Sequence, residues 1–278
     1  MNKESSIYKS IRNVYYGIKN FPSNTKLAID THSIKKFKDI HKGETCFIIG
    51  NGPSMRFSDL DRINELKVKS FACNKIFLGF NETKWKPDYF FVSDSKILKD
   101  INIDEVGLPY KKMFFPRSQK AHFKKGNFYN ELQHDWLKDS LFSFDAHTGV
   151  YAYGTIITEM LQFAYYMGFS KVYIIGVDFS YNMQSVDKKD RTFVSGGNNY
   201  FIKGYEKEGA VLNLSSPEAN INGFKAAKKV FESKGREIYN ATRGGKLEVF
   251  VRKNLDEVFK EIEDSKNENS SIYSDKNE

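Results

Sequence analysis

Residues 44–61, ETCFIIGNGPSMRFSDLD, join a buried strand to a loop of unusual composition. The apolar run at residues 46–50 predicts a strand buried on both faces, and residues 57–66 have the periodicity of an amphipathic helix. The loop between them, residues 50–54, reads Gly50, Asn51, Gly52, Pro53, Ser54. In an open α/β sheet, ligands bind beyond the carboxyl ends of the strands, and glycines there let the backbone approach a ligand closely. We therefore predict that residues 50–54, the Gly50 loop, bind a nucleotide and are more than a tight turn.

The Gly50 loop differs from the two most familiar phosphate-binding loops. It lacks the Gly-x-Gly-x-x-Gly pattern of dinucleotide-binding folds, and no Gly-Lys-Ser/Thr follows it as in a Walker A loop. Ser54 stands close to the start of the predicted helix, where its hydroxyl and backbone N–H can meet an anion. The sequence therefore predicts a nucleotide loop of a different type.

Buried strands alternate with helices along most of the chain. Further strands are predicted at residues 69–73, 89–92, 113–115, 172–177 and 237–239, and further helices at residues 149–167, 219–234 and 255–262. This alternation implies a mostly parallel sheet with right-handed crossovers, flanked by helices. The predicted fold class is α/β with a Rossmann-like sheet.

The chain divides into three parts of different character. Residues 1–43 are predicted to be a basic helical extension, whose apolar face packs on the domain or a sister subunit, or lies on an anionic membrane surface. Residues 44–262 are predicted to form the nucleotide-binding domain. A lid-like insertion is expected around residues 180–215, because polar segments of that length usually cover binding sites. Residues 263–278 are expected to be a polar, disordered tail.

The composition restricts the classes of partner. The 278 residues carry a formal net charge of +8, which favours anionic partners such as a nucleotide, an anionic lipid surface or a phosphorylated glycan. The sequence lacks nucleic-acid-binding signatures, so no nucleic-acid partner is expected. It also lacks an apolar run of about 18 residues and a signal peptide, so we expect a cytoplasmic protein, peripheral at the inner face of the membrane if the N-terminal helix binds lipid. Cys46 and Cys73 are predicted to be buried free thiols.

Polar residues follow several predicted strands. Asn74 and Asp94 come within two residues of the ends of the second and third strands, and Asp178 follows the strand at residues 172–177. Because parallel strands end at one edge of a sheet, these side chains are expected to line one rim. Asp178 is either a carboxylate that faces a ligand or a cap for the next turn.

Two further segments suit an anion. Thr148 and Gly149 stand at the predicted start of the helix at residues 149–167, where free N–H groups can meet a phosphate. His147, just before them, either contacts that phosphate or has no ligand role. The basic loop at residues 243–246, Arg-Gly-Gly-Lys, either binds a phosphate or only ends a strand in a turn.

These motifs together resemble two related groups of proteins. They are the Gly50 loop, the strand that ends in Cys73-Asn74, the run Thr148-Gly149-Val150-Tyr151, and GFSKVYIIGVDFSY at residues 168–181. They resemble glycosyltransferase family 42, the bacterial sialyltransferases of lipooligosaccharide synthesis. They are equally similar to the broader group related to 6-hydroxymethylpterin diphosphokinase, many of whose members occur in surface-polysaccharide gene clusters. Residues 235–250, GREIYNATRGGKLEVF, match that broader group better, and the resemblance spans residues 43–260.

The resemblance implies a fold, an activity and an assembly. The fold is a single Rossmann-like domain of the GT-A-variant type with a lid. The activity is transfer of an acidic, sialic-acid-like sugar from a CMP-activated donor to a bacterial surface glycan, with inversion and without an obligatory cofactor or metal. A homo-oligomer is implied as well, because sialyltransferases of this type often form tetramers.

The resemblance also implies roles for individual residues. Asn51 and Ser54 contact the nucleotide, and Asn74 holds the ribose and phosphate region. Thr148 and Gly149 hold cytidine or phosphate groups, and Tyr181 stabilises the leaving phosphate. Asp94 stands where the sialyltransferases carry an Asn, which leaves its role open.

One departure concerns the general base. The sialyltransferases place a His in the lid, and this chain has Tyr200 at that position. A tyrosine with a pKa near 10 is a poor base at neutral pH. The base is therefore Tyr200 in a perturbed state, or His147, Asp178 or Glu206, unless the acceptor hydroxyl needs little activation.

Two other functions remain open. A diphosphokinase that transfers pyrophosphate from ATP to a pterin alcohol would need Mg²⁺, for which Asp94 and Asp178 are the best-placed carboxylates. A non-catalytic nucleotide-binding partner in polysaccharide assembly would explain the missing His. Metal dependence separates the first alternative from the glycosyltransferase, for which we predict no metal site.

Overall fold

In a computed structural model, a parallel β-sheet with helices on both faces organises the chain. The structure describes residues 15–16, 32–94, 97 and 102–274, and of residues 269–274 the backbone alone. Within that part, eight strands form the sheet in the order β13-β12-β8-β1-β2-β3-β4-β5, and every pairing is parallel. Their bounds are Thr45–Ile49 (β1), Lys69–Cys73 (β2), Tyr89–Phe91 (β3), Met113–Pro116 (β4), Asn127–Tyr129 (β5), Lys171–Ile175 (β8), Glu237–Asn240 (β12) and Val251–Arg252 (β13). The predicted α/β Rossmann-like fold is confirmed.

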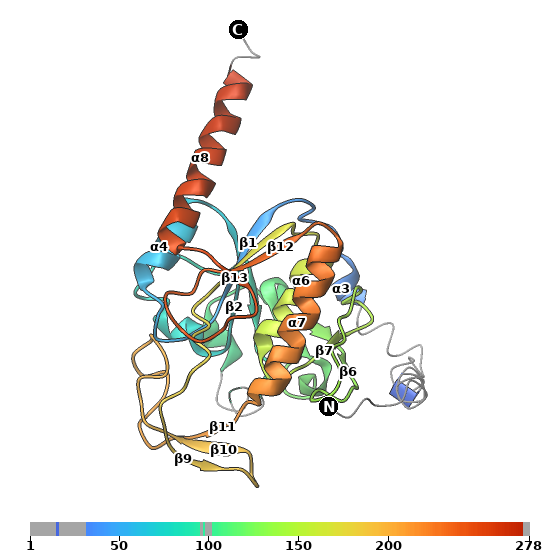
Figure 1. Cartoon of the computed structure of the whole chain (residues 1–278), viewed down its shortest axis with the longest axis vertical. Coiled ribbons are helices and arrows are strands. Elements are labelled where there is room, and N and C mark those ends of the chain that lie inside the picture. The colour runs from blue at the N-terminus through green and yellow to red at the C-terminus, as the bar shows by residue number, and fades with distance from the viewer. Residues whose placement is uncertain (1–14, 17–31, 95–96, 98–101, 275–278) are drawn as a thin grey trace.

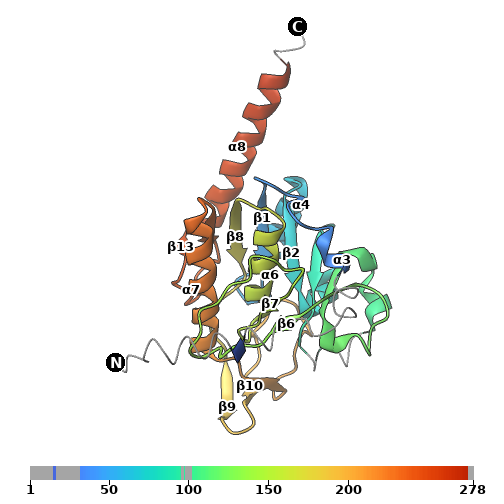
Figure 2. The same cartoon turned by 90° about the vertical axis from the view of Figure 1, so that its right-hand side faces the viewer.

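Helices cover both faces of the sheet because its strands are apolar on both faces (Figures 1 and 2). Cys46 and Ile48 of β1 point into one core, which they share with α6 (Ile156–Tyr166) and α7 (Pro217–Ser233). Phe47 and Ile49 point into the other core, with α4 (Phe57–Glu65) and α8 (Leu255–Ser274). Five shorter helices are also present: α3 (His32–Lys35), η1 (Asn74–Gly79), η2 (Ile103–Val106), η3 (Tyr110–Lys112) and η4 (Arg117–Gln119).

The strand order reverses between β1 and β8. From β1 the chain builds outward through β2, β3 and β4 to β5, and from β8 it builds in the opposite direction through β12 to β13. Such a switch point opens a crevice at the carboxyl ends of the two central strands, and ligands of open α/β sheets bind there. The Gly50 loop follows β1 and Asp178 follows β8, so both lie at this point.

A small antiparallel sheet forms the insertion that we predicted as a lid. It consists of β9 (Met183–Asp187), β10 (Thr192–Ser195) and β11 (Val211–Asn213) in the order β11-β10-β9. Figure 1 shows it at the end of the molecule opposite the projecting end of α8. A parallel pair, β6 (Glu131–Leu132) and β7 (Val150–Tyr151), lies beside α6.

Two predicted helix bounds were wrong, and several strands were not predicted. The helix predicted at residues 149–167 begins only at Ile156, because Val150 and Tyr151 pair with β6. The helix predicted to end at residue 262 continues to Ser274, since Arg62 binds Glu263 at 2.6 Å and Lys266 donates to the Leu66 carbonyl. The segments around residues 117–147 and 180–215 hold strands that we did not predict, among them β5, which extends the main sheet.

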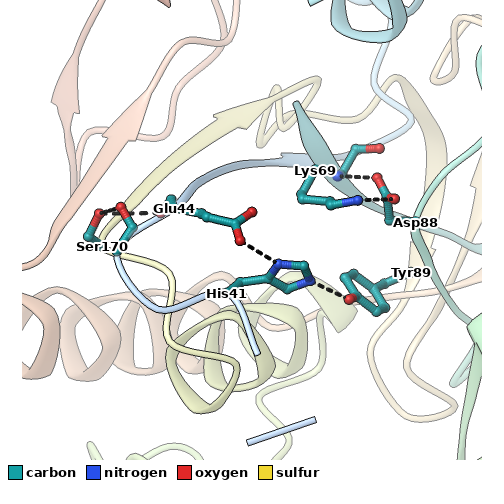
Figure 3. Close-up of polar contacts among 8 residues, drawn as sticks. His41, Glu44, Lys69, Asp88, Tyr89 and Ser170 are labelled. Carbon is teal, nitrogen blue, oxygen red and sulfur yellow. Dashed lines mark hydrogen bonds and ion pairs between the residues drawn. The ribbon is translucent and has the colours of Figure 1, made fainter. Parts of the chain in front are cut away.

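The polar network in Figure 3 stands at the amino ends of the strands, away from the switch point. His41 is buried there, with Nε2 2.5 Å from the Tyr89 hydroxyl and Nδ1 3.1 Å from a Glu44 carboxylate oxygen. Lys69 pairs with Asp88 at 3.1 Å, and burial raises the pKa of Tyr89. These contacts tie the segment before β1 to β3, which is a structural task.

Several predictions meet the limits of the described residues. Most of the predicted N-terminal helix, including Ile7, Ile11 and Ile18, lies outside them, so its proposed membrane contact stays a prediction. Ile34 and Phe37, which we had placed in the extension, pack into the core. Cys46 and Cys73 are buried free thiols, as predicted. None of the described helices is long and apolar enough to cross a membrane.

Candidate functional site

The Gly50 loop fits against the end of β8 so closely that two of its positions exclude a side chain. Gly50 and Gly52 donate backbone hydrogen bonds to the carbonyls of Ile175 and Gly176 at 2.8 and 2.9 Å. A Cβ at Gly50 would lie 2.3 Å from the Gly176 carbonyl oxygen. Gly176 itself has a φ of +66°, a conformation that glycine adopts without strain. The glycines of this loop therefore serve close backbone packing at the switch point.

Asp178 holds the Gly50 loop in place. Its Oδ2 accepts hydrogen bonds from the Ser54 hydroxyl at 2.8 Å and from the Ser54 backbone N–H at 3.4 Å. A Cβ at Gly52 would lie 1.9 Å from the same oxygen, so only glycine leaves room for this contact. The Asp178 side chain is buried (9% exposed). The carboxylate of Asp178 thus binds the Gly50 loop and not the turn that follows Asp178, and a direct role toward a ligand stays a prediction.

Two asparagine side chains at the ends of β1 and β2 have buried oxygens without a hydrogen-bond donor. Asn51 donates through Nδ2 to the Cys73 carbonyl at 3.1 Å and to the Tyr205 hydroxyl at 3.4 Å, and its Oδ1 receives nothing from the described residues. Asn74 Oδ1 is in the same state. Buried polar atoms in native proteins almost always have a partner, so an ordered water or a ligand is expected to donate to each of these oxygens.

The lid closes over Asn51 through aromatic side chains. The Phe201 backbone N–H donates to the Asn51 carbonyl at 3.2 Å. Tyr200 stacks on Tyr205 with 3.9 Å between the ring centroids, and Tyr205 is the residue that reaches Asn51 Nδ2. Burial raises the pKa of Tyr200 far above its ordinary value, so this phenol stays protonated at neutral pH.

Glu206 binds two other residues of the lid through its carboxylate. Its carboxylate accepts hydrogen bonds from the Ser195 hydroxyl at 2.7 Å and from the Asn199 backbone N–H at 2.9 Å. Asn199 in turn accepts from the Asn182 backbone N–H at 2.6 Å through Oδ1. We had considered Glu206 as a general base, and the structure gives both of its oxygens a structural partner instead.

The predicted phosphate site at Thr148 and Gly149 was wrong in its structural premise. Neither residue opens a helix: the Thr148 hydroxyl donates to the Asp145 carbonyl at 2.8 Å, and Gly149 leads into β7. His147 is half-buried, and its backbone N–H donates to Asp145 Oδ1 at 3.0 Å. The helix dipole on which we based a phosphate site is therefore absent at these three residues. A ligand role for them stays a prediction.

The N-terminus of α6 is formed by two residues that we did not predict as part of the site. Thr155 is the N-cap of this 11-residue helix, and its hydroxyl makes no capping hydrogen bond. Gly154, just before it, is exposed and has a φ of +78°. A Gly-Thr pair directly before an apolar run is a helix-start signal, and it could have been found in the sequence.

Asp94 and Gly154 hold the segment in which the chain returns from the lid. Asp94 accepts from Asn213 Nδ2 at 3.3 Å, and the Gly154 carbonyl accepts from the Ser215 hydroxyl at 2.9 Å. Asp94 and Asp178 thus have different partners, on the lid and on the Gly50 loop. Among the described residues, no group of three His, Cys, Asp or Glu side chains is placed to hold a metal ion.

Two predicted residues remain, Tyr181 and Arg243. The Tyr181 ring packs on Phe193 of β10, and burial, followed by the nearby Cys73, Glu206 and Asp178, raises the pKa of its phenol. Tyr181 therefore lies between the base of the lid and the ends of β2 and β8. Arg243 binds Asp59 at 2.6 Å and Asp256 at 2.8 Å, and phosphate binding by its loop stays a prediction. Its basic loop is therefore split, with Arg243 turned to α4 and α8.

A buried acid lies beside the rim and was not predicted. Glu159, in the first turn of α6, accepts hydrogen bonds from Tyr129 at the end of β5 and from Ser93 after β3. Burial, and secondly the charge of Glu131, raise the pKa of Glu159 to about 8. No signal in the sequence identifies it, because an isolated Glu in an apolar helix can equally face solvent.

A comparison with family models identifies the family of this chain. A family model described as 6-hydroxymethylpterin diphosphokinase MptE-like matches residues 18–184, more than half of the chain. Among solved structures, the chain is similar to the MAf glycosyltransferase from Magnetospirillum magneticum AMB-1, at 16% sequence identity and a TM-score of 0.47, covering 83% of this chain and 38% of that one. It is also similar to the sialyltransferase CstII from Campylobacter jejuni, in complex with the substrate analogue cytidine-5'-monophosphate, at 16% identity and a TM-score of 0.43, covering 76% of this chain and 85% of that one. The chain thus spans well under half the length of the MAf glycosyltransferase, and no curated protein matches it.

Proposed function

We propose that this chain, which belongs to the 6-hydroxymethylpterin diphosphokinase MptE-like family, is a glycosyltransferase that uses a nucleotide-activated sugar. The observation that carries the proposal is the pair of buried oxygens, Asn51 Oδ1 and Asn74 Oδ1, at the ends of neighbouring strands beneath the lid. A buried polar atom without a partner costs about 1–3 kcal/mol. A ligand that donates from hydroxyl or amino groups removes that cost when it binds.

The donor that we propose is a CMP-activated acidic sugar. Ribose hydroxyls and the cytosine amino group are donors of the kind that Asn51 and Asn74 lack. The N-terminus of α6, at Gly154 and Thr155, offers free backbone N–H groups and a positive dipole end to the phosphate. The choice of cytidine rests on the likeness of the Gly50 loop and the Val-Asp-Phe segment to sialyltransferase motifs.

The proposed reaction is transfer with inversion and without an obligatory metal. Positive charge then develops on the sugar and negative charge on the leaving phosphate, and fixed donors stabilise the phosphate. Tyr200 does not act as the base in this proposal, because its pKa is raised, and Glu206 is engaged in the lid. His147 and Asp178 remain the candidates for activating the acceptor, a bacterial surface glycan.

Two alternatives have specific support. The description of the family favours a diphosphokinase that uses ATP and Mg²⁺, with Asp94 and Asp178 as the carboxylates at the rim. The engaged Glu206 and the raised pKa of Tyr200 favour a non-catalytic nucleotide-binding partner in polysaccharide assembly.

A thermal-shift panel of CMP, CDP, UDP, GDP and ATP, each with Mg²⁺ and with EDTA, separates these functions. A ligand at about 100 times its Kd stabilises the native state by about 2.7 kcal/mol. We expect CMP and CDP to raise the Tm equally with and without EDTA, and CMP-sugar hydrolysis to follow. Stabilisation by ATP only with Mg²⁺ would contradict the glycosyltransferase, and CMP binding without hydrolysis or transfer would favour the non-catalytic partner.

A further inference from the structure

A cavity of about 440 Å³ lies beside the switch point, between α7 and the segment that follows β12. Lys225 and Lys228 of α7 and Lys246 of the opposite segment line it, together with the apolar side chains of Phe179 and Leu247. Its volume falls in the range of small-molecule sites, roughly 300–1,000 Å³. The mixture of cations and apolar walls suits a ligand that has an acidic group and an apolar face.

The protein neutralises the positive charge in this cavity only in part. In the described part of the chain, neither Lys225 nor Lys246 forms an ion pair. Lys228 donates to the Val249 carbonyl at 3.0 Å and lies 4.0 Å from Glu232. Glu248 also lines the cavity, but its carboxylate binds Arg252 at 2.9 Å. An anion that enters therefore meets an excess of cations.

Asp178, which binds the Gly50 loop, also contacts the segment that lines the cavity. The Lys246 backbone N–H donates to the Asp178 carbonyl at 2.8 Å, and a Cβ at Gly245 would lie 2.8 Å from that oxygen. Phe179, whose side chain lines the cavity, has a φ of +55°. This left-handed conformation is strained for a bulky residue, and such strain gathers at functional sites. Asp178 thus connects the two places: its carboxylate binds Ser54 and its backbone anchors Lys246.

We propose that this lysine cavity binds the acidic group, a phosphate monoester or a carboxylate, of the acceptor saccharide. Lysine ammonium groups bind phosphate and carboxylate as point charges, and the apolar walls cover the C–H face of a sugar ring. The assignment of this cavity to the acceptor rests on the proposed function, which places the donor nucleotide at the rim around Asn51 and Asn74. Binding of the acidic sugar itself does not depend on that assignment.

The test measures binding of glucose 1-phosphate, glucuronate and uncharged glucose to the whole chain by isothermal titration calorimetry. The double variant Lys225→Gln/Lys246→Gln removes the two unpaired cations, and Lys229→Gln/Lys234→Gln removes two exposed lysines that do not line the cavity. We expect the first variant to bind the acidic sugars about tenfold more weakly and the second to bind them like the wild type. Glucose is expected to bind far more weakly than either acidic sugar.

Equal affinities in the cavity variant and the wild type would overturn the inference. Equal losses in both variants would do the same, because they would show a general effect of net charge. The two acidic sugars decide between phosphate and carboxylate as the preferred group. CMP binding to the same samples tests the proposed function separately: its absence from the wild type removes the donor assignment, whereas the lysine dependence alone decides whether the cavity binds acidic sugars.

Discussion

Asn74 combines a left-handed backbone, with φ at +56°, and a buried side-chain oxygen that receives no hydrogen bond from the described residues. Asn is one of the few residues other than Gly that tolerate this conformation, so the backbone explains why a small residue stands there. It does not explain the unpaired oxygen, which a ligand would. Backbone and side chain therefore make separable contributions at this residue.

The variant Asn74→Gly separates them. Glycine adopts a positive φ without strain, so the Tm is expected to stay constant or to rise. The lost acceptor is expected to weaken CMP binding about tenfold, the value of a single hydrogen bond of roughly 1.4 kcal/mol. Asn198→Gly, at the exposed lid position with φ of +59°, is the matched control and should bind CMP normally. Unchanged CMP binding by Asn74→Gly would remove Asn74 from the site.

Tyr200 is expected not to act as a base. Because its pKa is raised well beyond the neutral range by burial, removal of its hydroxyl should leave the pH dependence of CMP-sugar hydrolysis unchanged. The variant Tyr200→Phe keeps the ring that stacks on Tyr205. A shift of the pH–rate profile in this variant would show that Tyr200 takes part in proton transfer.

Glu159 is expected to make stability depend on pH. Its pKa is about 8 in the folded chain, against an ordinary value of 4.5, so between these values the native state binds the proton more tightly than the unfolded state. The contribution to stability is therefore fully present below about pH 4.5 and is lost as the pH rises to about 8. Glu159→Gln removes this loss, so its Tm should gain on the wild type across that window. A constant difference in Tm from pH 5 to pH 8 would contradict the raised pKa.

At the scale of elements, the contact of β1 with β8 decides where the site forms. The Gly50 loop can lie at the end of β8 only because Gly50 and Gly176 allow their backbones to touch. The lid supplies the second wall through the contacts of Tyr205 and Phe201 with Asn51. The site is thus a product of three elements that are far apart in the sequence.

The variant Gly50→Ala tests this packing. Its Cβ would meet the Gly176 carbonyl oxygen, so the two backbones must separate, at an expected cost of about 1–3 kcal/mol in the free energy of unfolding. CMP binding should be lost with it. Gly204→Ala is the control: its Cβ meets open space, and only the strain of φ at +80° remains, so CMP binding should persist. Urea unfolding and CMP titration measure both effects, and normal CMP binding by Gly50→Ala would show that close packing is not required.

At the scale of the whole molecule, Arg243 ties the loop after β12 to α4 and α8. It binds the buried Asp59 and the exposed Asp256, and Asp59 also accepts from the Arg56 backbone N–H at 3.1 Å. This network explains why a basic loop that resembles a phosphate site serves the fold. Arg243 lies on the side of the sheet that α4 and α8 cover, whereas the lysine cavity lies beside α7. Arg243 and Lys246 of this loop therefore have different roles.

Removal of Arg243 should destabilise the chain strongly. In Arg243→Met, Asp59 keeps its burial and loses its cation, so the free energy of unfolding is expected to fall by about 3 kcal/mol. Lys171→Met breaks an exposed pair with Glu237, separated by 3.5 Å, and should cost less than about 1 kcal/mol. Equal midpoints of urea unfolding in the two variants would contradict a structural role for Arg243.

The class of fold and the location of the Gly50 loop follow from the amino-acid sequence alone. Apolar runs such as residues 46–50, too short for buried helices, can satisfy their backbones only in a covered sheet, and local composition marks where each strand ends. The edge strand β5 and the strands of the lid could not be predicted in this way, because they form through pairing with neighbouring strands and lack a hydrophobic pattern of their own. The start of α6 was misplaced for the same reason, since β6 captures Val150 and Tyr151.

The contacts of the polar residues, in contrast, depend on long-range packing. Ser54 and Asp178 are 124 positions apart, and no local pattern reveals that one donates to the other. The same holds for the engaged Glu206, for the buried Glu159, and for the three lysines that meet around one cavity. The physical reason is that burial and partners, which set the state of a polar group, arise from long-range packing, whereas the sequence states only which group is present.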